Sequence, residues 1–166
     1  MPSEATGLRF ESLDHDRVAA LARDPASALE LCSNADRIAD LVSSVMASTI
    51  ALYEPSGSYA PWISYLAWDG NTAVGSCSFV SPPRDGEVEI ASFTFPGGEG
   101  RGHATAMAAA LTLMALENGA RPIAHTLPEE NASTRILRKP GFIRSGVAQD
   151  DEVGEVWRWT LAPEAR

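Results

Sequence analysis

The chain has 166 residues, of which 45% are hydrophobic and 21% charged, and it carries a formal net charge of −9. These values predict a single globular domain, residues 1–166, with a full hydrophobic core. The acidic balance argues against general nucleic-acid binding, which needs a basic surface. It is explained either by solubility alone or by the attraction of a cationic partner.

Two further absences narrow the class of protein. The sequence has no signal-peptide pattern at its start and no apolar run of the ~20 residues that a membrane span needs. Cys32 and Cys77 are far apart and belong to no metal-ligand motif, which predicts two reduced thiols and no metal site. We therefore expect a cytoplasmic protein without membrane contact.

The first half of the chain is predicted to form a strand, three helices and a hairpin. Asp24 followed by Pro25 is a typical helix start, and Asp69-Gly70-Asn71 is a strong hairpin turn. The predicted elements are a strand at 8–13, helices at 16–23, from 25, and from a cap at Ser33 or Asn34 to Pro55-Ser56-Gly57, and strands at 62–68 and 72–80.

The second half alternates strands and helices. Gly119 and Gly141 each follow a helix-like segment, as glycine commonly does at a helix end. The predicted elements are strands at 87–95, 122–127, 142–147 and 153–161, with helices from the loop after residue 96 to 118 and at 131–139. This order is typical of a mixed α/β domain in which the strand-helix-strand middle contains parallel strands.

The most informative stretch is the glycine loop, residues 96–102, between a predicted strand and a predicted helix. It holds Gly97, Gly98, Gly100 and Gly102. Glycine permits positive φ and close backbone approach, while the first N–H groups of a helix are unpaired and lie at the positive end of its dipole. The loop therefore predicts a site for a phosphate-bearing cofactor.

Glycine-rich loops of this kind occur in three common types of phosphate-binding site. A P-loop requires a lysine after the glycines, and none is present. A dinucleotide fold requires GxGxxG after the first strand, but Gly100-Arg101-Gly102-His103-Ala104-Thr105 lacks the third glycine and follows a meander. The remaining possibility is coenzyme A bound by one strand-turn-helix unit.

Two motifs resemble the GNAT family of acetyl-CoA-dependent N-acetyltransferases, and in particular its ribosomal-protein-acetyltransferase-like branch. Glu99-Gly100-Arg101-Gly102-His103-Ala104 is similar to the family's pyrophosphate motif, Gln/Arg-x-x-Gly-x-Gly/Ala. Residues 125–142, which contain Pro128-Glu129-Glu130-Asn131-Ala132-Ser133 and end in Lys139-Pro140-Gly141-Phe142, resemble its distal motif. The resemblance implies an α/β GNAT fold in the order β-α-α-β-β-β-α-β-α-β-β, a mixed sheet of six to seven strands with helices on both faces.

The same resemblance implies where the cofactor binds. In that family two parallel strands splay apart, and pantetheine pairs with the exposed edge of the strand before the loop. The implied cofactor-binding residues are Phe93, Thr94, Gly100, Arg101, Gly102, His103, Ala104 and Asn131. Two positions depart from the family pattern, because Glu99 replaces a Gln or Arg and Glu130 replaces an Asn. Asn131 is equally explained as a helix N-cap.

Acetyl transfer to an amine needs a base that takes the amine proton. Glu89, on the strand before the loop, is the first candidate, and its alternative is an exposed acid on an alternating strand face. His125 is the second, because imidazole suits base chemistry near neutral pH, although a hydrogen-bonded core histidine is an alternative. The family's distal Tyr, an acid for the thiolate, is replaced here by Leu137, which leaves Ser133 as the nearest hydroxyl.

The leading hypothesis is an N-acetyltransferase that uses acetyl-CoA as co-substrate and acetylates a primary amine on a small molecule or peptide, and the acidic final hairpin would suit a cationic amine. The alternative is a CoA-binding regulatory or interaction module without catalysis, which Glu99, Glu130 and the missing Tyr motivate. Acetylation of charged tRNA is disfavoured by the acidic surface. A homodimer is common among similar proteins and is compatible with this chain.

Overall fold

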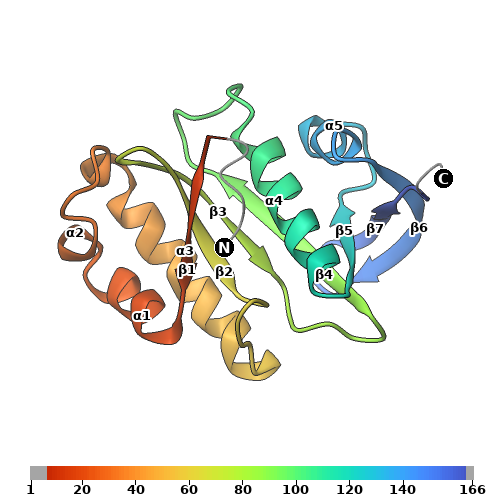
Figure 1. Ribbon diagram of the computed structural model, residues 1–166, viewed down its shortest axis with the longest axis horizontal. Coiled ribbons are helices and arrows are strands. Elements are labelled where there is room, and N and C mark those ends of the chain that lie inside the picture. The colour runs from red at the N-terminus through yellow and green to blue at the C-terminus, as the bar shows by residue number, and fades with distance from the viewer. Residues whose placement is uncertain (1–6, 164–166) are drawn as a thin grey trace.

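The computed structural model describes residues 7–163, in which seven strands form one sheet in the order β1-β2-β3-β4-β5-β7-β6 (Figure 1). All pairings are antiparallel except β4 with β5. The elements are β1 Arg9–Leu13, α1 His15–Arg23, α2 Pro25–Ala28, α3 Ala35–Ser56, β2 Ser64–Asp69, β3 Thr72–Phe79, β4 Glu87–Thr94, α4 His103–Glu117, β5 Arg121–Thr126, α5 Ala132–Arg138, β6 Phe142–Asp150 and β7 Gly154–Leu161. The predicted mixed α/β sheet is confirmed, and so is the short helix predicted to begin at Pro25, which is one helix more than the order implied by the family resemblance.

Local side-chain hydrogen bonds explain where the first helices begin. Asp14 accepts from the Arg17 N–H at 2.7 Å, so α1 starts one residue before the prediction. Asn34 is the residue before α3, but its side chain does not cap that helix. Its amide instead bonds both backbone groups of Ala73 in β3, at 2.9 and 3.2 Å. Asn34 thus stands at the predicted cap position, but the prediction that its side chain caps α3 is wrong, because the amide connects the start of α3 to the sheet instead.

Helices cover both faces of the sheet, as expected (Figure 1). Tyr53 of α3 donates to the Leu13 carbonyl at 2.9 Å and accepts from the Ser64 N–H at 2.7 Å, which fixes α3 beneath β1 and β2. Helix α4 packs on the other face, where a side chain at Gly75 would come 2.8 Å from the Met107 methyl and 2.6 Å from the Phe93 carbonyl. Gly75 thus lets α4 approach the sheet closely.

The sheet separates in its middle, and this separation positions the site. Strands β4 and β5 pair only where Glu87, Val88 and Glu89 face Arg121, Pro122 and Ile123. Beyond Glu89, β4 runs on for five residues without pairing to β5, and residues 91–93 are exposed. The expected splay of two parallel strands is confirmed.

Two features of composition also have structural counterparts. Cys32 and Cys77 are buried and unbridged. Within residues 7–163, no helix has the length and apolar character needed to cross a membrane, and no three His, Cys, Asp or Glu side chains gather as a metal ion would require.

Candidate active site

The gap between β4 and β5 holds a cavity of about 300 Å³, here called the split cavity. Its walls come from residues 89–94 of β4, Ala104, Ala108 and Leu111 of α4, residues 124–126 of β5, and Ser133, Ile136 and Leu137 of α5. The backbone of β4 lacks a β5 partner along this stretch, and an unpaired strand edge offers N–H and C=O groups to an amide-containing chain. The predicted residues Phe93, Thr94, Ala104 and Ser133 all line this cavity.

Glu89 and His125 meet at the closed end of the gap. His125 Nδ1 lies 3.1 Å from Glu89 Oε2, with both side chains about one quarter to one third exposed. The parallel register places Glu89 beside Ile123, so that residue 125, two positions further along β5, projects from the same face. The two base candidates are therefore partners in one pair, which period-two reasoning on separate strands could not reveal.

Glu89 also lines a second cavity of about 500 Å³, here called the acceptor cavity. This cavity lies between the C-terminal end of α3 and the β3–β4 connection, and its wall includes Leu52, Arg84, Glu87 and Ile123. Glu89 is the one residue that the two cavities share among those lining them. Glu89 therefore lies at the boundary of the two cavities.

Glu87 lies two residues before Glu89 on the same strand face, yet it has a different partner. Arg158 of β7 donates to Glu87 Oε2 at 2.6 Å, across the intervening strand β5. The Glu87 carboxylate is thus paired with an arginine, whereas the partner of Glu89 is a histidine. The two carboxylates on this strand face therefore differ in their partners.

The glycine loop forms a third cavity of about 360 Å³, here called the loop cavity. The predicted residues Gly100, Gly102 and His103 line it, whereas Arg101 is exposed and lines neither this cavity nor the split cavity. Both glycines have φ near +80°, the conformation that only glycine adopts at no steric cost. Thr94, Ala104 and Ile136 line both cavities, so the two spaces are neighbours.

Two details of the loop bear on anion binding. Glu99 Oε2 accepts a hydrogen bond from the Gly97 N–H at 2.9 Å, so the carboxylate is folded back onto its own loop. His103, only 7% exposed, has a buried Nδ1 with no hydrogen-bond partner among the described residues. A buried polar atom without a partner is unusual in proteins, and this one lies in the wall of the loop cavity.

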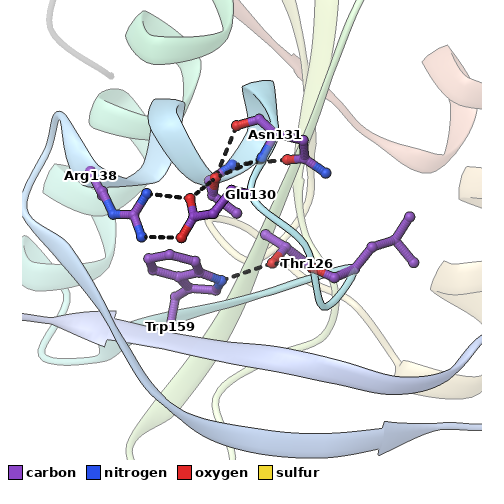
Figure 2. A network of polar contacts seen from close by, with 7 residues as sticks. Thr126, Glu130, Asn131, Arg138 and Trp159 are labelled. Atoms are coloured by element: carbon purple, nitrogen blue, oxygen red, sulfur yellow. Dashed lines mark hydrogen bonds and ion pairs between the residues drawn. The ribbon is translucent and has the colours of Figure 1, made fainter.

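A polar network holds α5 in place (Figure 2). Asn131 and Thr134 form a capping box, so the N-cap interpretation of Asn131 holds, and Asn131 lines neither the split nor the loop cavity. Arg138 donates two bonds to Glu130, at 2.6 and 2.7 Å, and its guanidinium lies 5.1 Å from the ring centre of Trp159.

The network reaches the split cavity through Trp159. This fully buried indole donates to Thr126 Oγ1 at 2.9 Å, and Thr126 lines the cavity. Hydrogen bonds from Arg138 first, and then from Thr134, lower the pKa of Glu130 to about 2. Glu130, which departs from the family pattern, therefore serves as the carboxylate that anchors Arg138.

Sequence reasoning missed two residues of the loop cavity. Arg135 and Lys139 line it opposite the glycines. The sequence did place these residues on one helix face, because Ala132, Arg135, Ile136 and Lys139 follow the i, i+3, i+4, i+7 spacing. That this face lies beside the glycine loop is seen only in the structure.

The chain combines a split mixed sheet with a glycine loop at the start of a long helix, an arrangement that offers a strand edge and helix N–H groups to a ligand. The family model described as acetyltransferase (GNAT) domain matches residues 8–143. The chain belongs to this family and is an N-acetyltransferase of the GNAT type.

Solved structures share the fold at low sequence identity. RimL, a ribosomal L7/L12 alpha-N-protein acetyltransferase in complex with coenzyme A, is 17% identical, with a TM-score of 0.65 and 96% of each chain covered. The acetyltransferase of Salmonella typhimurium that modifies the N-terminal serine of ribosomal protein L7/L12 is 17% identical, with a TM-score of 0.63 and coverage of 98% and 99%. A chimera of the Vibrio cholerae spermidine N-acetyltransferase SpeG and hSSAT is 12% identical, with a TM-score of 0.62 and coverage of 93% and 95%. No protein with a curated description matches this sequence.

Proposed function

We propose that this N-acetyltransferase binds acetyl-CoA with pantetheine in the split cavity and the diphosphate in the loop cavity, and acetylates a primary amine presented through the acceptor cavity. The observation that carries the proposal is the position of Glu89, which lines both the split and the acceptor cavities. The residues fit the cofactor, since an unpaired strand edge adjoins a glycine cradle at a helix N-terminus.

In this proposal Glu89 is the general base. An amine must lose a proton as it attacks, and a carboxylate at the junction of the two cavities is placed to accept it. His125, 3.1 Å away, orients that carboxylate and passes the proton towards solvent. Acetyl-CoA supplies the thioester that is attacked. Ser133, in the wall of the split cavity, is the hydroxyl proposed to stabilise the departing thiolate, because Leu137 offers no proton.

The acceptor is proposed to be a primary amine on a small molecule or peptide. The fold is shared with proteins named for acetylating a ribosomal protein's N-terminal amine and spermidine, and both acceptors carry primary amino groups. The net charge of −9 favours a cationic acceptor. A single catalytic domain, a cytoplasmic location and a homodimer remain predictions that accompany this proposal.

The first test measures release of free thiol when the protein is mixed with acetyl-CoA and a panel of primary amines. Glu89→Gln is expected to lower kcat by about a hundredfold or more, the range for removal of a general base, with CoA affinity unchanged. His125→Ala should lower kcat less, because it removes only the partner of the base.

Glu117→Gln, at the exposed end of α4, is the matched control and should not alter turnover. If neither Glu89→Gln nor His125→Ala slows the reaction, the assignment of the base is wrong. Tight CoA binding without thiol release for any amine would instead favour the non-catalytic module.

A further inference from the structure

The glycine loop carries a glutamate at the motif position where similar proteins have Gln or Arg. The negative charge of a bound phosphate would therefore have no cationic partner within the loop motif. Glu99 occupies the motif position that usually carries Gln or Arg, and its carboxylate is bonded to the Gly97 N–H. Arg101 is exposed and does not line the loop cavity. Glu99 itself lines the loop cavity, so the loop offers its backbone N–H groups and a carboxylate to a ligand that carries several negative charges.

Cations reach this cavity from another element. Arg135 of α5 and Lys139, the residue at the C-terminal cap of that helix, line the loop cavity together with Gly98, Gly100 and Gly102. Both side chains are exposed, and no ion pair or hydrogen bond to another described residue engages the guanidinium or the ammonium group.

Arg138, the other cation of this segment, is already paired and does not line the loop cavity. Arg138 is bound by both oxygens of Glu130 and lies over Trp159 (Figure 2). This contact fixes the helix against β7, so that the face bearing Arg135 and Lys139 is presented to the loop. The buried Nδ1 of His103, without a partner in the same wall, is an independent sign that the cavity is built for a polar ligand.

We infer that Arg135 and Lys139 form a cationic arm that binds phosphate groups of coenzyme A, in place of the side chain missing from the glycine loop. The inference rests on the proposed function and adds to it the residues that select a phosphorylated cofactor. The diphosphate and the 3′-phosphate of CoA share this chemistry. The arm therefore makes binding depend on the phosphates of the ligand and on ionic strength, in addition to the pantetheine contacts.

The test uses calorimetry with three ligands: CoA, 3′-dephospho-CoA and pantetheine. Arg135→Gln and Lys139→Gln are each expected to weaken CoA binding about fivefold, and the double variant about thirtyfold, as for partly exposed charge pairs. Pantetheine binding should change by less than about twofold, since no phosphate is present to contact. The decrease in CoA affinity with salt should be shallower in the double variant, because fewer counter-charges are paired.

Arg37→Gln, an exposed cation on α3 outside the three cavities, controls for the change in net charge and should leave all three affinities unchanged. Equal losses for CoA and 3′-dephospho-CoA assign the arm to the diphosphate, whereas a loss confined to CoA assigns it to the 3′-phosphate. Unchanged CoA affinity in the double variant, or an equal loss for pantetheine, overturns the inference. Failure of the unaltered protein to bind CoA would overturn the proposed function itself.

Discussion

At the scale of single residues, the glycine loop depends on backbone conformation more than on side-chain charge. Gly102 precedes α4 with φ +81°, and nothing lies within 4 Å of where a Cβ atom would be. A substitution at this position would therefore be disfavoured by backbone strain and not by lack of space. Non-glycine residues at such φ cost of order 1–3 kcal/mol. Gly102→Asp adds a carboxylate beside the proposed diphosphate and should weaken CoA binding by about a hundredfold. Glu99→Gln, which keeps an oxygen for the Gly97 N–H, should leave CoA affinity unchanged or raise it in the same titration; near-normal CoA binding by Gly102→Asp would contradict this account.

At the scale of elements, α5 is a short helix whose two ends are linked by an exposed ion pair between Glu130 and Arg138. The pKa of Glu130 falls from 4.5 to about 2 through bonds from Arg138 and then Thr134. Because the folded-state pKa is the lower one, the pair stabilises the protein above about pH 4.5 and loses this contribution as pH falls towards 2. Glu130→Gln should therefore lower Tm by about 1–3 °C at pH 7, and the difference from the unaltered protein should shrink below pH 4.5. Glu129→Gln is the control, and a difference that stays constant down to pH 2.5 would rule out this role.

At the scale of the whole molecule, the sheet consists of two parts joined along a short seam. Only three residue pairs connect β4 to β5, and the proposed cofactor occupies the gap beyond them. A ligand that binds only the folded state at a hundred times its Kd adds about 2.7 kcal/mol of stability, which corresponds to a rise in Tm of about 5–10 °C for a domain of this size. Thermal unfolding with CoA should show this rise, and adenosine at the same concentration should not produce it. The absence of any rise would count against cofactor binding across the seam.

The chain order of strands and helices was predictable from sequence, because hydrophobic period, turn residues and glycines act over short stretches. Asp24-Pro25, the Asp69-Gly70-Asn71 hairpin and Gly119 each mark a boundary within a few residues of the observed one. The glycine loop and the distal motif could likewise be recognised from sequence, since the residues of each are contiguous. The exception at Asn34 arose because its amide has a better partner in β3, 39 residues away.

Relations between segments were decided only by the tertiary structure. From sequence Glu89 and His125 were rival bases, but the short parallel register of β4 and β5 sets them 3.1 Å apart. Arg135 and Lys139 had no visible role until α5 was packed beside the glycine loop, and Glu130 was a departure from a motif until Arg138 bound it. Local sequence thus determined the elements and the family, because backbone preferences and motifs are local. Packing determined which side chains share a site, because residues far apart in the chain meet only when the sheet has formed.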